Sequence, residues 1–183
     1  MTLGNQTVII LITIIIIVYE HIKPRKGDSM TIEVGTKVDD FTLPDHNENE
    51  VKLSDLEGKK VLLSFHPLAF TSVCANQMQG LEANYEEFEE LDVVPLGISI
   101  DAVPAKKAWA EKLGLEKVQL LADFWPHGGL AKDLDIFRDE DGFSERANIL
   151  LDENGEVIYS QVYEISELPD PQEIIDFIKD SEE

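Results

Sequence analysis

Short apolar runs alternate with segments of helical periodicity along most of this 183-residue chain. Short runs rich in Val, Ile and Leu are typical of buried strands, and apolar residues that repeat every three or four positions are typical of amphipathic helices. The predicted strands cover residues 60–65, 93–100, 119–124, 146–152 and 156–163, and the predicted helices cover 74–91, 103–114 and the segment from Asp170 onward. This order, with a hairpin and a closing helix at its end, predicts an α/β three-layer sandwich with a mixed central sheet.

Local signals indicate where several elements begin. Residues 41–58 predict an N-terminal hairpin around a polar turn, followed by a helical turn that opens with a capping box of Ser54 and Glu57. Asp170 and Glu173 predict a second capping pair at the start of the last helix. One continuous helical face is predicted from Cys74, Met78, Leu81, Tyr85, Phe88 and Leu91.

Composition limits the classes of partner. The chain has 15 basic and 37 acidic residues, for a formal net charge of −22. Binding to a phosphate backbone requires clustered Lys and Arg, so we expect no nucleic-acid partner. The apolar fraction of 43% and the length suit one globular domain with a proper core.

Residues 1–29 differ from the rest of the chain. Residues 8–19 are a nearly continuous apolar run, and no charged residue occurs within 1–19. The basic cluster Lys23, Arg25 and Lys26 follows this run instead of preceding it, which does not fit a secretory signal. Two interpretations stay open: a membrane anchor, or a start-site artefact upstream of a domain that begins at Met30. The positive-inside rule would place the domain, residues 30–183, on the cytoplasmic side of an anchor. Either interpretation predicts a cytoplasmic, reducing location, where a free thiol persists.

Cys74 is the single cysteine, which excludes an internal disulfide and a zinc site built from several cysteines. A buried apolar role is the ordinary expectation for a free cysteine. However, Cys74 lies in the first turn of a helix that follows the strand 60–65, at the sheet edge where catalytic groups of α/β proteins gather. Unpaired amides at a helix N-terminus favour a thiolate, so a reactive sulfur facing the rim of the domain is the alternative.

The segment "PLAFTSVC" resembles the peroxiredoxins, because Pro67, Thr71 and Cys74 have the Pro-x-x-x-Thr-x-x-Cys spacing of that family. The segments "DFTLPD", "ADFWPHGGLAKDL" and "SERANILLDENGEV" resemble the same family in order and spacing. The resemblance is greatest to one-cysteine members of the alkyl hydroperoxide reductase E type and to thiol-specific antioxidant proteins. It covers the chain from Met30 onward and implies a thioredoxin-like fold.

The resemblance also implies roles for individual residues. Cys74 corresponds to the peroxidatic cysteine, Thr71 to the hydroxyl that positions the peroxide, Pro67 to the proline that shields the site from water, and Arg146 to the arginine that completes it. Gln77 stands where many relatives have a glutamate, which puts in doubt an acidic contact that orients Arg146.

The function that follows is a thiol-dependent peroxidase that reduces hydrogen peroxide or organic hydroperoxides. Because no second cysteine exists, the sulfenic acid on Cys74 would be resolved by an external thiol, either a low-molecular-weight thiol or a thioredoxin- or glutaredoxin-type protein. No cofactor is expected, and no metal site, since the four histidines are scattered. The resemblance implies a homodimer. The alternative is a thioredoxin-like redox-sensing or binding module without sustained turnover. His66 is near enough in sequence to contact the thiol site, or it packs the loop.

Overall fold

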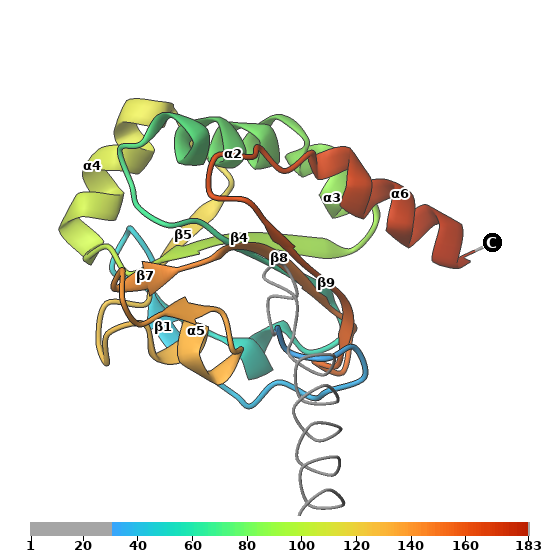
Figure 1. The fold of residues 1–183 in the computed structure, drawn as a ribbon. Helices are drawn as coiled ribbons and strands as arrows, with labels where there is room; N and C mark the ends of the chain where they lie inside the picture. The colour runs from blue at the N-terminus through green and yellow to red at the C-terminus, as the bar shows by residue number, and fades with distance from the viewer. Residues whose placement is uncertain (1–30, 183) are drawn as a thin grey trace, which may run out of the picture. The chain divides into compact units, whose positions relative to one another are not determined.

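A five-stranded mixed sheet forms the middle layer of the fold (Figure 1). The structure, a computed structural model, describes residues 31–182, so the predictions for residues 1–29 lie outside the described residues. The strand order is β5-β4-β3-β8-β9, with β3, β4 and β5 parallel and β8 antiparallel to both of its neighbours. The strands are β3 (Lys60–Phe65), β4 (Val93–Ser99), β5 (Gln119–Ala122), β8 (Arg146–Leu151) and β9 (Val157–Tyr163). The predicted mixed sheet and α/β class are therefore confirmed.

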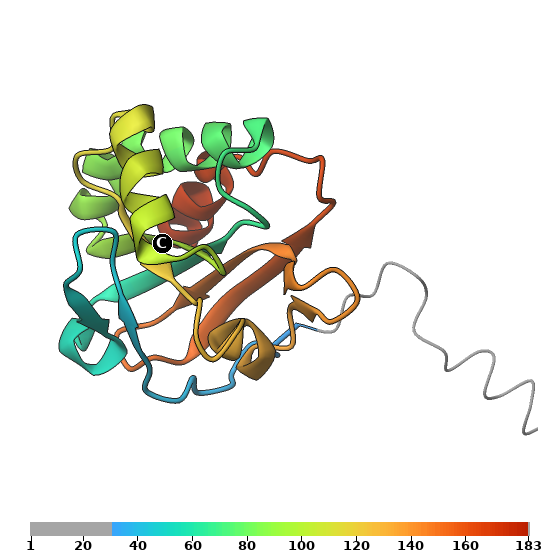
Figure 2. The ribbon, with the colours of Figure 1, turned by 90° about the vertical axis from the view of Figure 1, so that its left-hand side faces the viewer.

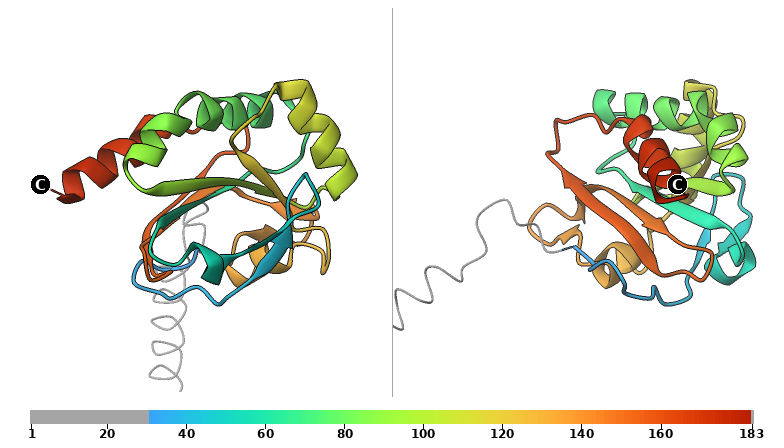
Figure 3. Two further views of the ribbon diagram at one scale, coloured as in Figure 1. Left: turned by 180° about the vertical axis from the view of Figure 1, so that it is seen from behind. Right: turned by 90° about the vertical axis from the view of Figure 1, so that its right-hand side faces the viewer.

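Helices cover one face of the sheet and shorter elements close the other, as Figures 2 and 3 show from three further sides. The first face carries α2 (Ser72–Ala83), α3 (Tyr85–Glu90), α4 (Val103–Leu113) and α6 (Pro171–Glu182). The other face carries η1 (Leu53–Leu56), α5 (Gly129–Asp133) and the predicted hairpin of β1 (Thr42–Pro44) and β2 (Glu50–Lys52); the short pair β6 (Phe137–Arg138) and β7 (Phe143–Ser144) follows α5. Within residues 31–182, none of the helices is both long and apolar enough to cross a membrane.

Strand alternation divides the apolar core between the two faces. Leu62 and Leu150 pack under the helices of the first face, whereas their neighbours Leu63 and Ile149 pack on the other. All four side chains are fully buried. Successive side chains of a strand point to opposite faces, so a sheet covered on both sides has continuous apolar runs such as those at 61–63 and 149–151.

Gly97 sets how closely α2 approaches the sheet. A Cβ built on Gly97 would lie 2.7 Å from Leu120 Cδ2 and would overlap Met78 Sδ. Met78 is one turn after Cys74 on α2, and it is fully buried. The missing side chain of a glycine in β4 therefore positions the helix that carries the cysteine.

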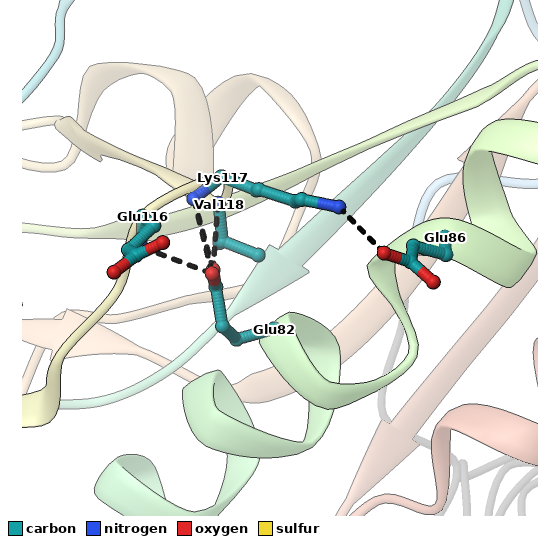
Figure 4. A network of polar contacts seen from close by, with 5 residues as sticks. All are labelled: Glu82, Glu86, Glu116, Lys117 and Val118. Carbon is teal, nitrogen blue, oxygen red and sulfur yellow. Dashed lines mark hydrogen bonds and ion pairs between the residues drawn. The ribbon is translucent and has the colours of Figure 1, made fainter.

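A carboxylate joins the end of α2 to the loop before β5 (Figure 4). The side chain of Glu82 accepts hydrogen bonds from the amides of Glu116 (2.9 Å), Lys117 (3.1 Å) and Val118 (2.8 Å). Successive backbone N–H groups form a concave anion site, which here is filled from within the chain. The contact fixes the C-terminal end of α2 against the strand next to β4.

Two local predictions are wrong. The continuous helix over 74–91 is interrupted at Asn84, whose side-chain Nδ2 donates to Gly80 O at 2.8 Å and competes with the helical backbone. The Ser54 capping box does not form, because η1 begins after Lys52 without a side-chain cap, and the amide of Ser54 donates to Asp40 Oδ1 at 2.9 Å.

Of the capping pair predicted for α6, Asp170 caps the helix and Glu173 does not. Asp170 Oδ1 accepts from the amide of Gln172 at 3.0 Å, as an N-cap residue does. Glu173 does not reach back to close a capping box. Its carboxylate instead accepts a hydrogen bond of 2.7 Å from the hydroxyl of Tyr163 on β9.

Candidate active site

Cys74 is the third residue of α2, in the first turn of the helix that follows β3. Only 1% of the residue is exposed, and it belongs to the apolar cluster under the helices. The prediction that its sulfur faces the rim is therefore wrong, because the helix rests its N-terminal turn on the sheet. Burial does not make the thiol an ordinary apolar residue, since a cation lies against it.

Arg146 contacts the cysteine from a distant part of the sequence. It is the first residue of β8, next to the end of β3, where Ala147 pairs with Phe65. Its Nη2 lies 3.4 Å from Cys74 Sγ, although the two residues are 72 positions apart. Nη2 and Nε also donate to Ile165 O, at 2.8 and 3.2 Å, and the side chain is 1% exposed. A buried guanidinium with these partners is held in one orientation beside the sulfur.

Gln77 contacts and orients Arg146, although it is a glutamine where many relatives have a glutamate. The Nη1 of Arg146 donates to Gln77 Oε1, so the guanidinium is oriented by a neutral amide and not by an acid. Gln77 Nε2 donates to Ser64 Oγ at 2.9 Å, and Ser64 Oγ donates to Asn148 Oδ1 at 2.8 Å. This buried chain of donors determines which end of the amide faces Arg146. Among residues 31–182, no carboxylate forms an ion pair with Arg146, so its guanidinium is not paired with an acid beside Cys74.

Pro67 and Thr71 lie in the loop between β3 and α2, as the motif requires. Pro67 is buried and Thr71 is exposed. Thr71 is the N-cap residue of α2, but its hydroxyl does not cap the helix and donates instead to Leu68 O at 3.0 Å. Phe70, directly before it, has a φ of +64°, a conformation that a bulky residue adopts only under strain.

The start of α2 also leaves amides free. Within the described part of the chain, the amide of Ala75 is the first in α2 with a helical acceptor, Thr71 O at 3.0 Å, and those of Val73 and Cys74 have no protein partner. Together these features give a thiol, a fixed cation, a hydroxyl whose proton is already donated and two unpaired N–H groups. Such an arrangement can hold an anionic sulfur and bind oxygen atoms next to it.

Lys106 is a buried polar residue that the sequence reasoning missed. It is 0% exposed, and its Nζ lies 3.4 Å from Nε2 of His66, which is also 0% exposed. The signal was present, because Lys106 occupies the apolar face of α4 together with Trp109 and Ala110, at spacings of three and four. His66 both packs the loop, with its ring 5.0 Å from the Trp109 ring, and reaches a polar partner.

Within residues 31–182, no cluster of three or more His, Cys, Asp or Glu residues could hold a metal ion. The polar groups around Cys74 are cationic or neutral, so they suit an anionic sulfur. They do not form a site for a cation.

Comparisons with known proteins agree with this geometry. The family model described as the AhpC/TSA family matches residues 34–160. Alkyl hydroperoxide reductase E of Mycobacterium tuberculosis is 36% identical over 140 residues, which is 76% of this chain and 91% of that protein. Peroxiredoxin Bcp of Bacillus subtilis is 33% identical over 135 residues, or 70% of this chain and 84% of that protein.

Solved structures of other proteins share the fold of this chain. The reduced 2-Cys peroxiredoxin of Plasmodium vivax superimposes with a TM-score of 0.75 at 31% identity, over 81% of each chain. Peroxidoxin BcpB of Mycobacterium tuberculosis gives a TM-score of 0.72 at 24% identity, over 81% of this chain and 97% of that one, and shows the fold alone. The thioredoxin-like fold is thus confirmed. The chain belongs to the AhpC/TSA family and is a thiol-dependent peroxidase of the peroxiredoxin type.

Proposed function

We propose that Cys74 is the peroxide-reactive thiol of this peroxidase and that an external thiol returns it to the reduced state. The observation that carries the proposal is the 3.4 Å contact between Arg146 Nη2 and Cys74 Sγ. A guanidinium stays protonated at all working pH values, so it favours the thiolate, which is the nucleophilic form of cysteine.

The first step is attack by the thiolate on one oxygen of the hydroperoxide. An S–O bond forms while the O–O bond breaks, and the departing oxygen takes up a proton and leaves as water or an alcohol. The sulfur is oxidised to a neutral sulfenic acid and the peroxide is reduced by the same two electrons. In this step Arg146 and the unpaired amides of Val73 and Cys74 stabilise negative charge on the peroxide oxygens, a role supported by the contact of Arg146 with Cys74 Sγ and by the free N–H groups.

Thr71 and Pro67 fit supporting roles in this step. Because the Thr71 hydroxyl already donates to Leu68 O, its oxygen is left to accept the O–H of a hydroperoxide. Pro67 is buried in the same loop and offers no N–H, which supports the proposed role of shielding the site from water without competing for the substrate.

Recycling requires thiols from outside the chain. A first thiol condenses with the sulfenic acid to give a mixed disulfide and water, and a second thiol releases reduced Cys74 and an external disulfide. Since Cys74 is the single cysteine, neither step has an internal alternative. The reductant is either a low-molecular-weight thiol or a thioredoxin- or glutaredoxin-type protein.

The test is peroxide consumption with and without reductant. Wild-type protein alone should consume about one equivalent of peroxide and gain one oxygen atom, and added thiol should restore cycling. Cys74→Ser should consume none under either condition. Equal consumption by Cys74→Ser would reject Cys74 as the reactive group. A single turnover that no thiol can renew would favour a redox-sensing module instead.

A homodimer and a cytoplasmic location complete the proposal. Phe70, Phe124 and Trp125 are 53%, 52% and 82% exposed, and they lie in the loops that follow the parallel strands β3 and β5, at the same end of the sheet as Cys74. Exposed aromatic side chains of this kind support contact with a second copy, which light scattering would test. N-terminal sequencing of the native protein would show whether residues 1–29 are present to tether it to the cytoplasmic face of a membrane.

A further inference from the structure

The Lys106 ammonium lies inside the protein without an ion pair. It is 0% exposed, and among residues 31–182 its one hydrogen-bond partner is His66 Nε2, at 3.4 Å. Lysine is almost never fully buried unless it is paired with a carboxylate. Burying the Lys106 ammonium without an ion pair lowers the stability of the fold, so we expect a role for this residue in the site around Cys74.

His66 is held as a neutral ring. Burial, and the positive charges of Lys106 and Arg146, place the pKa of His66 well below its ordinary value of 6.5. Its Nε2 faces an ammonium and must accept the hydrogen bond, which leaves the proton on Nδ1. Within residues 31–182, Nδ1 has no hydrogen-bond partner. The ring therefore orients Lys106 without neutralising it.

Three acidic groups act on Lys106 from farther away. Burial lowers the pKa of Lys106 to about 7, and the charges of Asp101, Asp123 and Cys74 oppose that shift. Asp101 Oδ2 also accepts from the Ala69 amide at 2.8 Å. Its hydrogen bonds within the fold keep it in place throughout the reaction.

Asp123 is also held in place by hydrogen bonds, because its two carboxylate oxygens accept from the amides of Leu130 and Ala131 at 3.1 and 3.0 Å. The charge of Lys106 also acts on His46, where burial lowers the pKa of the ring and favours the neutral form. Cys74 lies in the same buried cluster as Trp109 and Ala110 of the helix that carries Lys106. In its thiolate form it carries the charge that is lost when peroxide oxidises the sulfur.

We propose that Lys106, held by His66, is a second cation of the peroxidase site and stabilises the Cys74 thiolate together with Arg146. Lys106 is a positioning residue in this role, since it acts on the sulfur through the field and does not touch it. If the thiolate favours the ammonium, the ammonium favours the thiolate by the same factor. The proposal rests on Cys74 as the reactive thiol, and it predicts that the charge states of the two groups change together.

The first test measures iodoacetamide alkylation of Cys74 against pH in full-length protein. Lys106→Met should move the midpoint of the profile to higher pH and lower the rate below the midpoint by threefold to tenfold, as expected for loss of a nearby opposite charge. Lys107→Met is the matched control, because it removes the same charge from an exposed position of the same helix. Lys106→Arg keeps the charge and should keep the midpoint. An unchanged midpoint in Lys106→Met overturns the proposal.

The second test does not depend on how a Lys106 variant folds. In protein labelled with ¹³C-lysine, the Cε resonance of Lys106 should titrate at lower pH in Cys74→Ser than in the wild type, because the serine hydroxyl carries no charge. Identical titrations would overturn the coupling. Both tests use no peroxide, so a failure of the peroxidase assay and a failure of this proposal are observed separately.

Discussion

Replacing Arg146 by alanine removes the guanidinium that contacts the sulfur. At the 3.4 Å that separates Nη2 from Sγ, the attraction between two unit charges is about 5 kcal/mol for an effective dielectric constant of about 20. Part of this attraction is offset by the cost of keeping both groups from water. We therefore expect a smaller net effect, in the range that oxyanion donors show: about 3 kcal/mol in the transition state, or a rate lower by about one hundredfold.

Two measurements separate the effects of the guanidinium. Alkylation against pH reports the thiolate, and the stopped-flow rate with peroxide reports the transition state. In Arg146→Ala the alkylation midpoint should rise, and the peroxide rate should fall further than the lost thiolate explains. Arg146→Lys restores a charge without the planar fork, so it should recover the midpoint better than the rate.

Two controls accompany the Arg146 variants: one tests whether Arg146→Ala is folded, and the other tests whether loss of an arginine away from the sulfur has any effect. Arg146→Ala also leaves Ile165 O and Gln77 Oε1 without their donor, so its fold must be checked by circular dichroism. Arg138→Ala removes an arginine that pairs with Asp141 at 2.6 Å and with Glu145 at 3.1 Å; neither carboxylate is a partner of Arg146, so both profiles should stay unchanged. An unchanged midpoint together with an unchanged peroxide rate in folded Arg146→Ala would refute the proposed role.

Two further predictions concern the charges around the site. Gln77→Glu has nearly the same size and would place a carboxylate on Arg146, so the alkylation midpoint should rise; an unchanged or lower midpoint would contradict the view that a neutral partner leaves the charge of Arg146 to Cys74. Lys106 has a pKa of about 7 in the folded protein, below the ordinary 10.5, so above pH 7 the unfolded chain binds a proton that the folded protein lacks, and the free energy of unfolding should rise with pH. Lys106→Met should lack this rise and should be more stable than the wild type at pH 7. In urea unfolding, the difference in unfolding free energy between the two proteins should narrow by about 2 kcal/mol from pH 7 to pH 9. A difference that stays constant over this range would show that Lys106 does not titrate there.

The sequence determined the sheet and the local frame of the site. The predicted strands 60–65 and 146–152 contain the consecutive apolar residues 61–63 and 149–151, which is a property of strands buried on both faces, and the structure confirms both strands. Pro67, Thr71 and Cys74 are eight residues or fewer apart, so their placement in one loop and one helical turn follows from local structure. The single cysteine likewise determined that no internal disulfide can resolve the reaction.

Tertiary structure decided the contacts that cross the sheet. Periodicity could not show that the helical face from Cys74 to Leu91 breaks at Asn84, because the break depends on a side chain that bonds back to Gly80. The sequence around Gln77 did not indicate its partner, because Arg146, whose guanidinium it orients, is the first residue of a strand 69 positions later.

The family resemblance had placed Arg146 near Cys74, but no pattern in the sequence joins residues 72 positions apart. Lys106 stands on an apolar helical face, a position that by itself predicts burial but not a neighbour. Only the packing of α4 against the end of β3 brings its ammonium to His66 and into the field of the thiol. The physical reason is general: periodicity and turn chemistry act within a few residues, whereas the electrostatics of a buried thiol depend on whichever charges the fold encloses with it.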